Sequence, residues 1–221
     1  MSGTSSPRPS RRRRNSNQPS NVTRVAREVR VGAERLAKWL AGFAERHGET
    51  EQTITPDVVE LVGADDARAW IDVPFPPLTG DLVEHALRER RVGVLLVRRG
   101  GFAVGVFDGS RLVASKVDSS YVQGTTKAGG WSQQRFARRR ANQASAAFAD
   151  AAEAAARVLG GVGLDAFVVG GDRDAVRTVL TDRRLAHLEP VGPWLTVKDP
   201  KRKILEQMPE QFRAVRIRLD P

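Results

Sequence analysis

The residues best suited to chemistry lie in one short segment, Lys127–Arg140, with the sequence KAGGWSQQRFARRR. It contains the pair Gly129 and Gly130, two adjacent glutamines, and five cations without any acidic residue. Paired glycines give the backbone access to positive φ and a close approach to a ligand. A glutamine amide can hold a water and a developing oxyanion about 3 Å away without itself titrating. Chemistry on an ester attached to RNA would require this combination.

Charge of a single sign on one helix face predicts contact with a polyanion. Three of the arginines have i, i+3, i+4 spacing and therefore share a face of the expected helix. A purely solvated face would mix signs to limit repulsion, so we expect the first two turns to contact phosphates. The residues expected to contact RNA are Lys127, Trp131, Ser132, Arg135, Arg138, Arg139 and Arg140.

Purely structural interpretations of the same residues stay open. Ser132 can be the N-cap of the helix, with Gln133 and Gln134 in its first turn. Trp131 can stack on a terminal base or anchor the loop in the core. A helix start is also a rigid support for a projecting loop, so the structural and the catalytic interpretations are compatible.

The remaining charge lies mostly at the N-terminus. The 221 residues carry a formal net charge of +10, and residues 1–30 contain eight arginines and one glutamate. We expect residues 1–21, rich in Ser, Pro, Arg and Asn, to be a disordered basic tail that is either solvated or bound to rRNA. The globular remainder is nearly neutral.

Composition excludes several other classes of protein. Cysteine is absent, which removes disulfides, thiolate nucleophiles and Cys-based zinc sites and favours the cytoplasm. No apolar run approaches the roughly 20 residues that cross a membrane. The three histidines, at 47, 85 and 187, lack the spacing of paired metal ligands, so we expect neither a metal nor a cofactor.

Periodicity predicts the elements that must position this segment. Helices are expected over 22–43, 81–90, 132–159 and 174–182, with a short amphipathic segment at 203–212. Strands are expected over 92–99, 102–107, 111–118, 164–169, 194–197 and 215–219, and strand or short helix around 58–62 and 69–73. Gly-Gly and Asp-Gly turns make the first three strands an antiparallel meander. The expected fold is mixed α/β, with a helical region at 22–89 packed on a catalytic domain at 90–221.

Two further patterns allow competing interpretations. Gly170–Gly171 stands at a strand-to-helix junction, where it could bind a phosphate or simply make a tight connection. Four aspartates near strand ends could hold a metal in a nuclease, or could serve as turn and cap residues. These are Asp108, Asp118, Asp165 and Asp172.

The order of meander, glycine-rich basic loop, long helix and βαβ-like tail resembles the catalytic domain of eukaryotic and archaeal class-I release factors. It is closer still to ribosome-rescue peptidyl-tRNA hydrolases, which include the ankyrin-and-zinc-finger protein of animals, and specifically to their compact actinobacterial branch. The resemblance covers roughly residues 90–200 and rests on KAGGWSQQRFARRR. It implies a ribonuclease H-like fold. It also implies an enzyme that hydrolyses peptidyl-tRNA on stalled large ribosomal subunits and contacts the CCA end of the tRNA. The resemblance leaves the oligomeric state open, and we expect a monomer.

In that family one glutamine presents water to the ester. The Gly-Gly-Gln tripeptide of release factors is interrupted here by Trp131 and Ser132, whereas rescue-type relatives place the glutamine three residues after a glycine. That spacing leads from Gly130 to Gln133, and Gln134 remains an alternative. A non-catalytic RNA-binding protein and a tRNA nuclease are the competing functions.

Overall fold

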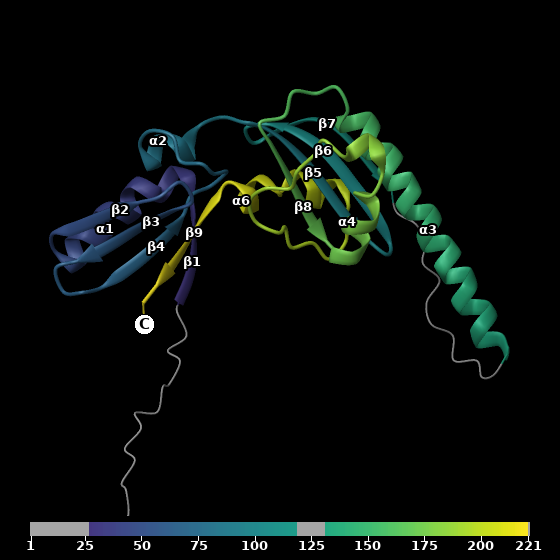
Figure 1. Ribbon diagram of the computed structural model, residues 1–221, viewed down its shortest axis with the longest axis horizontal. Helices are drawn as coiled ribbons and strands as arrows, with labels where there is room; N and C mark the ends of the chain where they lie inside the picture. The colour runs from purple at the N-terminus through teal and green to yellow at the C-terminus, as the bar shows by residue number, and fades with distance from the viewer. Residues whose placement is uncertain (1–26, 119–130, 221) are drawn as a thin grey trace, which may run out of the picture.

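Two β-sheets form the body of the protein (Figure 1). The computed structural model describes residues 27–118 and 131–220, with side chains from Gln143 onward in the helix that begins at Trp131. The predictions for the tail at 1–21 and the loop at 121–130 lie outside the described residues. The first sheet has the strand order β1-β9-β4-β3-β2 and the second has the order β7-β6-β5-β8.

The first sheet is antiparallel throughout and joins the two ends of the described chain. Its strands are β1 (Arg27–Gly32), β2 (Thr50–Ile54), β3 (Val58–Gly63), β4 (Arg68–Asp72) and β9 (Ala214–Leu219). The turn η1 (Ala33–Arg35) and the helices α1 (Leu36–His47) and α2 (Leu82–Leu87) pack with it around one core. Buried and partly exposed residues alternate along β3, as expected for a sheet covered on one face.

The helix expected over 22–43 is wrong in its first half, because residues 27–32 form β1. Val29 and Val31 pack against the first core, whereas the neighbouring Glu28 and Arg30 are exposed, which is the alternation of a strand with one buried face. The second half is confirmed: α1 ends at Gly48, which has φ 77°. The described part of the region 22–89 therefore contains four strands beside its helices.

The second sheet confirms the predicted meander and the mixed α/β fold class. Strands β5 (Arg91–Arg98), β6 (Gly101–Asp108) and β7 (Arg111–Asp118) are antiparallel, and β8 (Ala166–Gly171) runs parallel to β5. One face is covered by α3 (Trp131–Leu159), α4 (Arg173–Val179) and the turn η2 (Arg183–Leu185). The other is covered by α5 (Arg202–Glu206) and α6 (Pro209–Phe212). Burial on both faces explains why β5 and β8 are continuously apolar.

Two C-terminal segments differ from expectation. The strand expected at 194–197 is reduced to a bridge between Leu195 and Gly170, with Pro193, which has no backbone N–H to donate, beside it. The last strand, β9, lies between β1 and β4 of the first sheet. The predicted unit 90–221 thus contributes its final strand to the N-terminal sheet, and the division at residue 90 stays a prediction.

Candidate functional site

The predicted site residues from Trp131 to Arg140 occupy the first turns of α3. This helix has 29 residues, which corresponds to about 43 Å of length. Figure 1 shows its first half projecting away from the sheets while its last turns lie against β6. Neither α3 nor any other helix in the described part of the chain is long and apolar enough to cross a membrane.

Small buried side chains anchor the second half of α3. The buried residues are Ala147, Ala151, Ala152, Ala154, Ala155 and Leu159, and Phe148 and Val158 are partly buried beside them. Alanine adds almost no bulk, so the helix axis can lie close to the sheet. The apolar stripe predicted for this helix is confirmed from position 147 onward.

The anchored half sets the position of the candidate glutamines. Gln133 lies 14 residues before Ala147, the first buried residue of the described part of α3, and this spacing amounts to about 21 Å along the helix axis. Ser132 is the second residue of the helix, so it is not the N-cap. Gly129, Gly130 and Lys127 lie outside the described residues. The remaining predicted site residues therefore all lie along the projecting half of one helix.

Strands β5, β7 and β8 end at the same edge of the second sheet. Asp118, the last residue of β7, pairs with Phe102, while Arg98 of β5 pairs with Gly101. Gly171 of β8 pairs with Val97. The chain thus leaves β7 toward α3 at the edge where the parallel strands finish, which is the edge that commonly binds ligands in α/β sheets. Exposed arginines at 98, 99 and 173 lie at this edge together with the acidic Asp118 and Asp172.

The pair Gly170–Gly171 makes a tight connection rather than a phosphate site. A Cβ at Gly170 would lie 2.4 Å from the backbone oxygen of Leu195, and one at Gly171 would lie 2.1 Å from the backbone oxygen of Val97. Gly171 also has φ +95°, which favours glycine. The following N-terminus of α4 is capped by Asp172, whose Oδ1 accepts from the backbone N–H groups of residues 174 and 175.

Three of the four aspartates considered for a nuclease have structural partners. Arg91 donates to Asp108 at 2.7 Å, and this hydrogen bond holds the pKa of Asp108 below its usual value. The backbone N–H of Arg91 donates to Asp165 at 2.7 Å, and Asp172 is the helix cap described above. Within residues 27–118 and 131–220, His, Asp and Glu side chains form no group of three that could hold a metal.

The histidines also have local structural roles. His47 Nδ1 lies 2.9 Å from Asp65 Oδ2, and the bond from His47 is the main reason that the pKa of Asp65 is lowered. His85 is buried: its Nδ1 lies 3.2 Å from the backbone nitrogen of Thr79, and its Nε2 lies 2.8 Å from the oxygen of Pro74 and 3.0 Å from Nη2 of Arg90. His187 is exposed.

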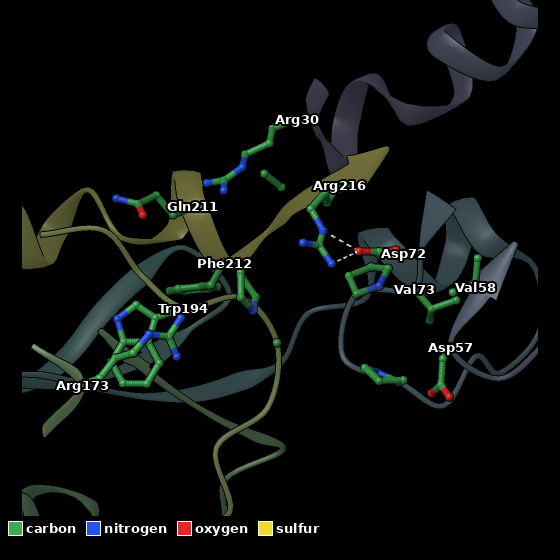
Figure 2. Close-up of a pocket in the computed structure, with 15 residues that line it drawn as sticks. Arg30, Asp57, Val58, Asp72, Val73, Arg173, Trp194, Gln211, Phe212 and Arg216 are labelled. Atoms are coloured by element: carbon green, nitrogen blue, oxygen red, sulfur yellow. Dashed lines mark hydrogen bonds and ion pairs between the residues drawn. The ribbon is translucent and has the colours of Figure 1, made fainter. Parts of the chain in front are cut away.

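A second basic region, which sequence reasoning missed, lies between the two sheets. It is a cleft of about 560 Å³ that Figure 2 shows in close-up. The three arginines that line it are Arg30, Arg173 and Arg216. They lie 43 to 186 positions apart in the chain, so no local motif could have indicated that they meet.

Comparison with known proteins identifies a family for the chain. Residues 90–218, more than half of the chain, match the family model described as Actinobacteria/chloroflexi VLRF1 release factor. The matched span runs from β5 to β9 and includes the whole of α3. No curated protein matches the chain.

Proposed function

The chain belongs to the Actinobacteria/chloroflexi VLRF1 release factor family, and on this premise we propose that it hydrolyses peptidyl-tRNA on stalled large ribosomal subunits. Water attacks the carbonyl carbon of the ester that joins the nascent peptide to the terminal tRNA adenosine. The bond from that carbon to the ribose oxygen breaks, which gives a peptide carboxylate and a tRNA with a free 3′ end. No redox partner is needed.

The placement of the glutamines on α3 is the observation that supports this proposal most strongly. Both lie in the first turn of a helix whose far half is packed on the sheet through a stripe of alanines. The first half of α3 extends about 21 Å beyond the half that is packed on the sheet. The glutamines at its end can therefore reach an ester in a narrow site that the two-sheet body is too wide to enter. The rigid helix keeps the tip in a defined position, and catalysis by positioning depends on that.

Only one of the two glutamines can face a given ester. Successive residues of an α-helix point about 100° apart, because the helix has 3.6 residues per turn. The spacing from Gly130 favours Gln133 as the residue that orients water, with Gly129 and Gly130 shaping the loop. Lys127 and the arginines at 135, 138, 139 and 140 then bind tRNA or rRNA phosphates, Trp131 and Ser132 contact the CCA end, and the N-terminal tail adds rRNA affinity.

Peptide release from peptidyl-tRNA bound to purified large subunits tests the proposal. We expect Gln133→Ala to slow single-turnover release by about 100-fold or more, the usual effect of removing one positioned hydrogen-bonding group. Gln143→Ala is the matched control, because it makes the same change on an exposed position of the same helix. We expect that control to release peptide at the parent rate.

Other outcomes identify the competing functions. If Gln133→Ala and Gln134→Ala both release peptide as fast as the parent, the glutamine mechanism is wrong. If both glutamines are dispensable while Arg138→Ala abolishes subunit binding, the protein is a non-catalytic anchor. A shortened tRNA among the products would identify a nuclease, whereas intact tRNA supports hydrolysis.

A further inference from the structure

The cleft between the sheets has two differently built walls (Figure 2). One wall carries Arg173 from the start of α4 and Trp194 from the segment between η2 and α5. The other carries Arg30 from β1 and Arg216 from β9. A volume of about 560 Å³ lies in the range of pockets that enclose small organic groups.

Trp194 and Arg173 form a fixed stacking surface. The indole Nε1–H of Trp194 donates to the backbone oxygen of Gly171 at 3.1 Å, which orients the ring. The guanidinium carbon of Arg173 lies 4.5 Å from the centre of that ring. Arg173 is exposed and forms no ion pair with any other residue that the structure describes. A guanidinium over an indole ring offers a surface on which a nucleobase can stack.

The opposite wall holds two guanidinium groups on neighbouring strands. Arg30 and Arg216 are direct cross-strand partners in the antiparallel pair β1 and β9. Like charges in that arrangement repel each other. Asp72 pairs with Arg216, but among residues 27–118 and 131–220 Arg30 has only Glu28 at 3.5 Å, and half of the Arg30 side chain is exposed. A phosphate between the two arginines would relieve the repulsion and accept hydrogen bonds from both.

The other polar groups of the cleft restrict what it can recognise. Both polar atoms of the Gln211 side chain are hydrogen-bonded to the backbone of Thr196. Oε1 accepts from the Thr196 N–H at 2.8 Å, and Nε2 donates to the Thr196 oxygen at 3.0 Å. The Gln211 side chain is therefore not free to read the edge of a base. Asp57 lies at the end of the cleft away from Trp194 and Arg173 (Figure 2).

We propose that this cleft binds a short single-stranded segment of RNA. One base stacks on the layer formed by Arg173 and Trp194, and a neighbouring phosphate lies between Arg30 and Arg216. The site is separate from α3 and does not depend on ester hydrolysis. Because stacking and phosphate contacts carry the binding, we expect little sequence preference.

Binding of a fluorescein-labelled uridine hexamer to the full chain, measured by anisotropy, tests the proposal. We expect Arg173→Ala to weaken binding about tenfold, within the range seen when one stacking contact is lost. Arg30→Ala should weaken binding and lower the salt slope by about 0.7, the value for one phosphate contact on a single strand. Arg177→Ala is the matched control, since it removes the same charge from α4 outside the cleft lining. The control should bind within twofold of the parent.

Cross-linking locates the bound strand directly and separates this site from other basic segments. With 4-thiouridine in the hexamer, we expect adducts on the peptides that contain Arg173 or Trp194, and Trp194→Phe should reduce their yield. Unchanged affinity in both Arg173→Ala and Arg30→Ala would overturn the proposal, as would adducts confined to residues outside the cleft. Uridine monophosphate that competes as strongly as the hexamer would show that a free nucleotide, rather than a strand, is the ligand. Peptide release is a separate measurement, so its absence would leave this result intact.

Discussion

Asp72 on β4 and Arg216 on β9 form an ion pair between strands 144 residues apart in the sequence. Arg218, two positions further along β9, lies 3.2 Å from the other oxygen of the same carboxylate. One acidic side chain thus binds two arginines of the last strand to the middle of the first sheet.

Replacing Asp72 with asparagine should lower the free energy of unfolding by about 1 kcal/mol, because it removes charge from a partly exposed ion-pair network. The two arginines would then lie side by side without a counter-charge. Urea denaturation followed by circular dichroism gives the change. Asp174→Asn is the control, since its pair with Arg177 is almost fully exposed. Equal midpoints for the two variants would contradict a structural role for Asp72.

Ile217 tests the importance of β9 for the first sheet. Its side chain is fully buried and packs in the same core as Ile71 and Phe43. Ile217→Ala should cost about 2–5 kcal/mol through lost burial and the cavity that remains. Val113→Ala, on an exposed position of β7, should cost far less. Thermal unfolding of both variants makes the comparison, and similar losses would show that β9 is not a core strand.

Ser145 tests whether α3 must be rigid. It is exposed and lies just before the anchored half of the helix. Proline there removes a helical hydrogen bond and clashes with the preceding turn, at a cost of about 3 kcal/mol or more. We expect Ser145→Pro to slow peptide release severely while the β-sheet contribution to the circular dichroism spectrum is retained. Ser145→Ala should release peptide normally. Normal peptide release by Ser145→Pro would show that α3 need not be a continuous helix.

Asp182 gives the stability of the protein a pH dependence. The side chain and then the backbone N–H of Arg184 donate to its carboxylate and lower its pKa from 3.8 to about 2. A lowered pKa means that the carboxylate stabilises the fold above pH 4, and that this contribution is lost as the pH falls from about 4 to 2. Asp182→Asn should therefore lower Tm at pH 6, and the difference from the parent should shrink by pH 2.5. If the Tm difference between Asp182→Asn and the parent stayed constant with pH, the pair of Asp182 and Arg184 would not be its cause.

Local signals predicted the second sheet well. The turns at Gly100–Gly101 and Asp108–Gly109 connect strands that are neighbours in both sequence and space, so the meander could be found from its own residues. The apolar face of α3 from Phe148 to Val158 could be predicted for the same reason, because its residues are close together in the sequence. The hairpins of the meander are fixed by these local turns, although one face of the sheet is covered by helices as distant in the chain as α5 and α6.

Distant pairing was not predictable in the same way. Val29 fits a helical repeat that continues through Leu36 and Phe43, yet β1 gains its hydrogen bonds from β9, almost 190 residues later. No pattern inside residues 27–32 reveals that partner. The cleft between the sheets depends on the same pairing, because Arg30 and Arg216 are neighbours only once β1 and β9 have joined.

The position of β9 also dictates an order of events during synthesis. All strands of the second sheet have been made by residue 171, whereas Arg27 must wait for Leu219 before its strand has a neighbour. Contacts of such large sequence separation form late. During synthesis the first sheet therefore stays open until residues 214–219 have been made, long after every strand of the second sheet is complete.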